Sequence, residues 1–179
     1  IRPPPRPPPD TSSAASDVYK RQPLRLVNGP SNFPMHDLGV GTTIVTGGAG
    51  LIGSAMIWGI NNRNLNNVIS VDDYETGSLK ERNLAPLDIQ GQIPTQDFRN
   101  LFRDQSPKLN DVKTVIHLGA CSSTTETNEE YLNDNNLLYT KELCEWALKN
   151  EVRFIYASSA ATYGDGDMGM DDEETEIER

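Results

Sequence analysis

The sequence predicts an α/β fold built on a doubly wound parallel sheet that is truncated after its fifth strand. Short β-branched runs alternate along the chain with longer segments whose apolar residues recur at helical spacing. The first of these runs leads into a glycine-rich turn at residues 46–54, and a segment with helical spacing follows at once. Strands that alternate with helices favour a parallel sheet with right-handed crossover connections.

The expected elements follow from where these two patterns switch. Strands are expected at residues 42–45, 67–71, 87–89, 112–118 and 152–157, and helices at residues 50–61, 78–83, 95–104 and 128–150. In the third helix, Thr95 is the expected N-cap, and Phe98 and Phe102 share one face. The apolar stripe of the long last helix consists of Leu132, Tyr139, Leu143, Trp146 and Ala147.

The glycine turn predicts a phosphate-binding site. Gly47 allows a tight turn, Gly50 lets backbone approach a pyrophosphate, and Gly53 lets the helix pack closely on the sheet. The following helix offers unpaired N–H groups and the positive end of its dipole to the phosphates. The spacing is Gly-x-x-Gly-x-x-Gly rather than Gly-x-Gly-x-x-Gly. An ordinary glycine turn is the alternative, but the strand before it and the helix after it favour a Rossmann-type dinucleotide site.

An acid follows the second expected strand. Asp72 lies about 20 residues after the glycine turn, where an acid accepts hydrogen bonds from the adenosine ribose. A solvated turn acid is the alternative. Such an acid favours NAD, whereas Lys80 or Arg82 would neutralise the 2′-phosphate of NADP. From these residues alone, both cofactors stay open.

Small and hydroxyl-bearing residues follow the fourth and fifth expected strands. Residues 119–122 come at the carboxyl end of the fourth strand, beside the point where ligands bind in open α/β sheets. A serine- and threonine-rich turn that caps the next helix is the alternative. Ser158 and Ser159 end the fifth strand, where a hydroxyl can bind a reacting alcohol or ketone or serve as a helix cap. We expect His117 to be a core residue and Cys121 a small filler.

The net charge and the cysteine pattern disfavour several kinds of partner and site. The formal net charge of −10 disfavours nucleic acid and anionic membranes as partners. No apolar run approaches the ~18 residues of a membrane span, and no signal peptide is visible. The two cysteines lie far apart, so neither a disulfide framework nor a metal site is expected. We therefore expect a cytoplasmic protein.

The chain divides into three parts. Residues 1–40 begin with a proline-rich run and continue without periodicity, so we expect a disordered or extraneous tail. A ligand for SH3-type domains is the alternative interpretation of that run. Residues 41–164 form the expected dinucleotide-binding domain. Residues 165–179 are rich in Asp and Glu and are expected to be an acidic loop, the start of a region that the chain end cuts off.

With these residues assembled, the chain resembles the extended short-chain dehydrogenase/reductase superfamily and, within it, the ADP-L-glycero-D-manno-heptose 6-epimerases. The resemblance rests on residues 44–54, 119–126, 134–143 and 156–164. The run Ala-Cys-Ser-Ser-Thr-Thr-Glu at residues 120–126 separates this family from related 4-epimerases and 4,6-dehydratases. The resemblance implies epimerisation at C6 of an ADP-heptose, a precursor of the lipopolysaccharide inner core, by a protein that forms homo-oligomers.

The resemblance also implies which residues contact the cofactor. Together with the glycine turn it gives this expected set: Gly47, Gly50, Leu51, Ile52, Gly53, Asp72, Asp73, Lys80, Leu118, Gly119, Ala120, Cys121, Ser122 and Asn135. The implied cofactor is NADP, with NAD possible as well. Lys80 matches a family lysine near the adenosine phosphate with a register shift of one residue, and a second family lysine is Thr95 here. For Asn135, a polar surface position on the helix is the alternative.

Only one member of the family's Ser-Tyr-Lys catalytic set is present. Ser159 matches the serine, but the chain contains no matching Tyr-x-x-x-Lys pair. We therefore expect an N-terminal fragment of an enzyme that is inactive alone. The alternatives are another nucleotide-sugar 4-epimerase or 4,6-dehydratase, or a dinucleotide-binding module without catalytic activity.

Overall fold

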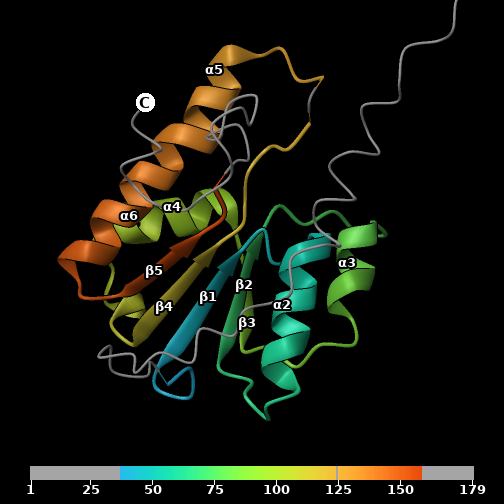
Figure 1. The fold of residues 1–179 in the computed structure, drawn as a ribbon, viewed down its shortest axis with the longest axis vertical. Coiled ribbons are helices and arrows are strands. Elements are labelled where there is room, and N and C mark those ends of the chain that lie inside the picture. Colours follow the sequence, from blue (N-terminus) through green and yellow to red (C-terminus); the bar gives the residue numbers. More distant parts are fainter. Residues whose placement is uncertain (1–36, 124, 159–179) are drawn as a thin grey trace, which may run out of the picture. The chain divides into compact units, whose positions relative to one another are not determined.

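The protein is described by a computed structural model that covers residues 37–123 and 125–158. Its centre is a parallel five-stranded sheet with the order β3-β2-β1-β4-β5. The strands are β1 (Thr42–Thr46), β2 (Val68–Asp72), β3 (Gly91–Pro94), β4 (Val112–His117) and β5 (Arg153–Tyr156). The order reverses between β1 and β4, as in a doubly wound sheet. The predicted Rossmann-type fold is therefore confirmed (Figure 1).

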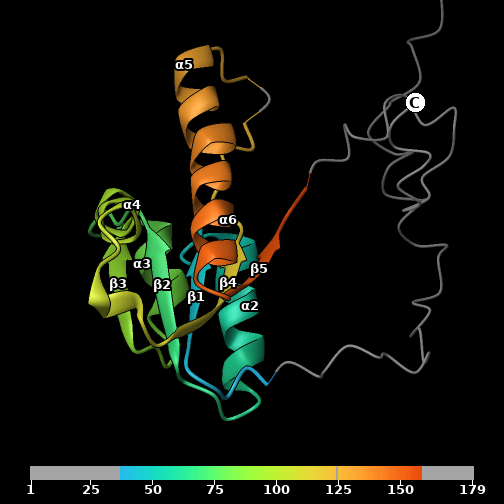
Figure 2. The same cartoon turned by 90° about the vertical axis from the view of Figure 1, so that its left-hand side faces the viewer.

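Helices connect the strands in the predicted alternation. They are α2 (Leu51–Asn61), α3 (Leu79–Leu84), α4 (Thr95–Arg103), the 3-10 turn η1 (Pro107–Leu109), α5 (Glu129–Leu132), η2 (Asn133–Leu138) and α6 (Tyr139–Lys149). The last three join into one helix whose middle, η2, is π-helical. The α5 end of this helix extends past the carboxyl ends of the strands (Figures 1 and 2).

Two apolar clusters cover the two faces of the sheet, and α4 and α2 lie on opposite sides of the strands (Figure 2). The first cluster joins Phe98 and Phe102 of α4 to Tyr139 and Leu143 of α6. The second cluster joins Ile57 and Ile60 of α2 to β1, β2 and β4. The helical spacing of the residues in α4 and α6 predicted the packing of the first cluster, because positions three and four apart share one helix face.

Three local predictions are wrong. The third strand is β3 rather than residues 87–89, which form a loop that packs Leu87 and Ile89 on the second cluster. Thr95 is the first helical residue, and Pro94 holds the cap position without a side-chain hydrogen bond. The fold includes residues 37–40, because their turn places Leu38 on the second cluster. The remaining predictions for the tails lie outside the described residues.

Among residues 37–123 and 125–158, no helix combines the length and the apolar character that crossing a bilayer requires. The longest continuous helix, α5 to α6, carries charged side chains along its length.

Candidate cofactor-binding site

A cavity of about 440 Å³ lies at the carboxyl edge of the sheet. It is bounded by the glycine turn, the end of β2, the start of α4, the segment after β4, and the α5–α6 helix. Its lining contains Thr46, Gly47, Gly50, Leu51, Ile52, Gly53, Asp72, Asp73, Lys80, Thr95, Leu118, Gly119, Ala120, Ser122, Tyr131, Asn135 and Tyr139. All residues of the expected cofactor set except Cys121 are among them. This is the edge where ligands bind in open α/β sheets.

The glycine turn leaves the first turn of α2 open to the cavity. Gly47 has a φ of +65°, and a Cβ there would lie 2.9 Å from the backbone of Gly119, so only glycine fits. Among the residues that the structure describes, no side chain caps α2, and no acid lies in its first turn. The first intrahelical bond at this end runs from Ser54 N–H to the Gly50 carbonyl, at 2.9 Å. The N–H groups of residues 51–53 and the helix dipole therefore suit an anion such as a pyrophosphate.

Asp72 connects β2 to the glycine turn. Its side chain accepts hydrogen bonds from the N–H groups of Ala49, at 3.0 Å, and Asp73, at 2.8 Å. Asp72 is 8% exposed and lines the cavity. Asp72 therefore holds the turn in place as well as offering oxygen atoms to a ligand.

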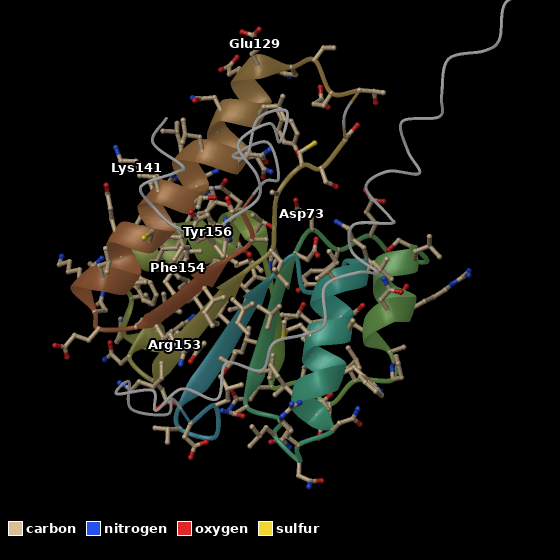
Figure 3. The ribbon with its side chains drawn as sticks, in the orientation of Figure 1. Asp73, Glu129, Lys141, Arg153, Phe154 and Tyr156 are labelled. Atoms are coloured by element: carbon tan, nitrogen blue, oxygen red, sulfur yellow. The ribbon has the colours of Figure 1, made fainter. Side chains whose placement is uncertain are left out.

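Lys80 pairs with Asp72 at this end of the cavity. Lys80 Nζ lies 2.7 Å from Asp72 Oδ1 and 3.1 Å from the Asp73 carbonyl oxygen. The Lys80 side chain is 43% exposed, so its ammonium group stays accessible. Figure 3 shows Asp73 at the carboxyl edge of the sheet.

A chain of hydroxyl groups fixes the segment after β4. Thr46 Oγ1 accepts hydrogen bonds from the N–H groups of Leu118, at 3.2 Å, and Gly119, at 3.1 Å. Because both lone pairs are then used, its O–H donates to His117 Nδ1, 2.7 Å away. His117 is therefore neutral, with its proton on Nε2.

The same chain continues into the π-helical segment. His117 Nε2 donates to Thr140 Oγ1, at 2.9 Å, and Thr140 donates to the Asn136 carbonyl, at 2.7 Å. Burial lowers the pKa of His117 to about 4, which keeps the imidazole neutral. The prediction that His117 is a core residue is confirmed.

Cys121 is not among the lining residues, and Asn136 holds its backbone. Asn136 Oδ1 accepts from Cys121 N–H at 2.8 Å, and Asn136 Nδ2 donates to the Cys121 carbonyl at 3.0 Å. Asn135, next along η2, lines the cavity. Both cysteines are free thiols. Within the described part of the chain, no His, Cys, Asp and Glu cluster could hold a metal ion.

Sequence reasoning missed four lining residues. Thr46, Tyr131 and Tyr139 were not expected in the cavity, and Thr95 was considered only as an N-cap and as the position of a family lysine. Tyr139 sits in an apolar stripe, so its spacing indicated the core alone. The expected catalytic residue, Ser159, lies outside the described residues.

A family model described as NAD dependent epimerase/dehydratase family matches residues 43–179. The chain belongs to this family. It is 43% identical over 136 residues to the ADP-L-glycero-D-manno-heptose-6-epimerase of Nitratidesulfovibrio vulgaris strain Hildenborough, an alignment that covers 76% of this chain. That alignment covers 42% of the relative, so the chain spans well under half of its length.

Two solved structures extend the comparison. The Helicobacter pylori ADP-L-glycero-D-manno-heptose-6-epimerase superposes with a TM-score of 0.61 at 26% identity, over 80% of this chain and 47% of that one. The Bacillus cereus UDP-glucuronic acid 4-epimerase in complex with NAD gives a TM-score of 0.55 at 25% identity, over 69% of this chain and 42% of that one. The second comparison shows that a relative with this fold binds NAD.

Proposed function

We propose that the chain supplies the dinucleotide-binding half of an enzyme that epimerises an ADP-heptose at C6 for the lipopolysaccharide inner core. The observation that carries this proposal is the 43% identity to a heptose epimerase over the region that builds the cavity. The run at residues 120–126 lies within the aligned region, and its resemblance to the run typical of heptose epimerases supports the same proposal.

The cavity residues fit a dinucleotide. The open first turn of α2 would hold the pyrophosphate, and Asp72 with Asp73 would hold the adenosine ribose. The small residues Gly119 and Ala120 leave room beside β4 for the nicotinamide half. When bound, the cofactor would supply a hydride acceptor and donor. Ser159 would orient the reacting oxygen of the sugar, beside acid–base groups that this chain does not contain.

We propose NADP as the preferred cofactor because Lys80 places an accessible ammonium group beside the ribose-binding acids. It neutralises Asp72 and offers a counter-charge to a 2′-phosphate. Lys80→Met should therefore weaken NADP binding several-fold more than NAD binding, as measured by isothermal titration calorimetry. Equal affinities of the parent protein for both cofactors would contradict the preference.

The substrate assignment is tested on a protein with the full length of its relatives. Purified protein is incubated with ADP-D-glycero-D-manno-heptose and, separately, with UDP-glucuronic acid, and the products are separated by anion-exchange chromatography. The UDP-sugar is included because a UDP-glucuronic acid 4-epimerase shares this fold. We expect turnover of the ADP-heptose alone. Turnover of the UDP-sugar alone would favour a 4-epimerase, and dinucleotide binding without turnover of either would favour a binding module.

A further inference from the structure

Tyr139 has a hydroxyl group that finds no hydrogen-bond partner within the described part of the chain. The side chain is 1% exposed and belongs to the first apolar cluster, yet it also lines the cavity. Its Oη finds no hydrogen-bond partner within residues 37–123 and 125–158. A buried hydroxyl without a partner costs about 1–3 kcal/mol, so such a group in a binding cavity calls for an explanation.

The ring of Tyr139 is held on several sides. Phe102 stacks parallel to it at 6.2 Å between ring centroids, and His117 meets it edge-on at 5.0 Å. The Arg99 guanidinium lies 5.1 Å from the ring centroid, and two hydrogen bonds to Asp134, of 2.6 and 2.9 Å, fix that guanidinium. The hydroxyl therefore cannot swing toward another acceptor without breaking these contacts.

The surroundings of the hydroxyl indicate which half of a dinucleotide it faces. Burial raises the pKa of Tyr139, and the charges of Asp73 and Asp72 at the end of β2 raise that pKa further, against the opposing charge of Arg99. Thr95, at the start of α4 beside β3, lines the same cavity. Asp72 and Asp73 therefore lie near enough to the hydroxyl for their charges to act on it, and they stand at the end of β2, on the side of the switch point where a doubly wound fold places the adenosine half.

We infer that the Tyr139 hydroxyl hydrogen-bonds the adenosine half of the bound dinucleotide, at its base or ribose, and that this bond contributes to nucleotide affinity. The inference rests on the proposed dinucleotide binding and adds a residue to it. In the free protein the hydroxyl carries an unsatisfied cost, and the ligand removes that cost on binding. Affinity thus gains because the new bond satisfies a hydroxyl group that has no partner in the free protein.

The matched test is Tyr139→Phe, which deletes one oxygen atom and keeps the ring and its packing. Binding of NAD, of AMP and of nicotinamide mononucleotide is measured by calorimetry, with the weaker ligands in competition. We expect NAD and AMP to bind about 3- to 10-fold more weakly, and nicotinamide mononucleotide to be unaffected. The melting temperature of the free protein should stay the same or rise, because the unsatisfied group is gone.

The control is Tyr156→Phe. Tyr156 ends β5, is 55% exposed and is not part of the cavity lining, so the same deletion there should leave all three affinities unchanged (Figure 3). Unchanged AMP affinity in Tyr139→Phe would overturn the inference, as would a loss confined to nicotinamide mononucleotide. Failure of the parent protein to bind either NAD or NADP would instead overturn the proposed function on which the inference depends.

A measurement on the parent protein keeps the inference testable if Tyr139→Phe does not fold. Tyrosine labelled with ¹³C at Cζ gives one signal for each of the six tyrosines. Titration with AMP should shift the Tyr139 signal to saturation, because its hydroxyl gains a hydrogen bond. A Tyr139 signal that stays in place while AMP saturates the protein would overturn the inference.

Discussion

Replacing Gly53 with alanine tests how the glycine turn and α2 are joined. A Cβ at Gly53 would lie 2.7 Å from both the Gly47 carbonyl carbon and Gly48 Cα, and closer still to the Gly47 carbonyl oxygen. These are backbone atoms of a turn that Asp72 also holds, so no flexible side chain can move aside. Overpacking costs about 1–3 kcal/mol, and rigid neighbours place this case near ~3 kcal/mol. The helix propensity of alanine returns up to ~1 kcal/mol, which leaves a net loss of about 2 kcal/mol.

Gly59→Ala is the matched control in the same helix. The nearest atom to a Cβ there is Arg63 Nη1 at 4.0 Å, so the substitution meets no obstruction. We expect it to stabilise the protein by about 0.5–1 kcal/mol through helix propensity alone.

The assay is urea unfolding followed by circular dichroism. With a slope of about 2 kcal/mol/M, the midpoint should fall by roughly 1 M for Gly53→Ala and rise by a few tenths of 1 M for Gly59→Ala. Two midpoints that move in the same direction would refute the reasoning, because the chemical change is identical and only the surroundings differ.

Two further predictions concern the hydroxyl chain behind the cavity. The pKa of His117 is about 4 in the folded protein and 6.5 when unperturbed, so the unfolded chain binds more protons between these values and stability falls as the pH drops. From pH 7 to pH 5 this histidine should remove about 2 kcal/mol from the free energy of unfolding. Urea titrations at the two pH values should show that His117→Gln loses this part of the pH dependence. An equal pH dependence of stability in the parent protein and in His117→Gln would refute the prediction. Thr46→Val keeps the side-chain shape but leaves the N–H group of Gly119 without its acceptor and His117 Nδ1 without its donor, whereas the N–H group of Leu118 keeps the Thr46 carbonyl oxygen, 3.2 Å away. It should therefore cost about 2 kcal/mol more than Thr46→Ser in the same assay. Equal losses in the two Thr46 variants would show that the hydroxyl is dispensable.

The sequence predicted the fold class because the apolar periodicity and the glycine turn agree. Residues 91–94 escaped prediction, since Gly91 and Pro94 are typical of turns and Ile93 is their only apolar residue. Within the described residues β3 pairs with β2 alone, so as an edge strand it tolerates a proline. Residues 87–89 were wrongly predicted as a strand because Leu87 and Ile89 are half-buried in a loop on either side of an exposed residue. This gives the alternation of apolar and polar residues that is typical of a strand.

The glycine turn of the candidate site was predictable because a sequence motif specifies its backbone geometry. The contacts between residues that lie far apart in the sequence were not predictable. The bond from Ala49 to Asp72 and the bond from Thr46 to His117 span long stretches of chain and exist only in the folded sheet. Tyr139 was correctly predicted to belong to the helix's apolar stripe, but spacing carries no information on where a hydroxyl points. The two hydrogen bonds between the Asn136 side chain and the Cys121 backbone likewise join the helix to the segment after β4, and they exist only in the folded protein.

The central claim is that the cavity beside the glycine turn binds a dinucleotide. The direct measurement is a ¹H–¹⁵N correlation spectrum of the labelled protein during titration with NADP. We predict saturable shifts of the amide signals from residues 47–53 at the start of α2 and from residues 118–122 after β4. Absence of saturable shifts, or shifts confined to residues away from this cavity, would contradict the claim.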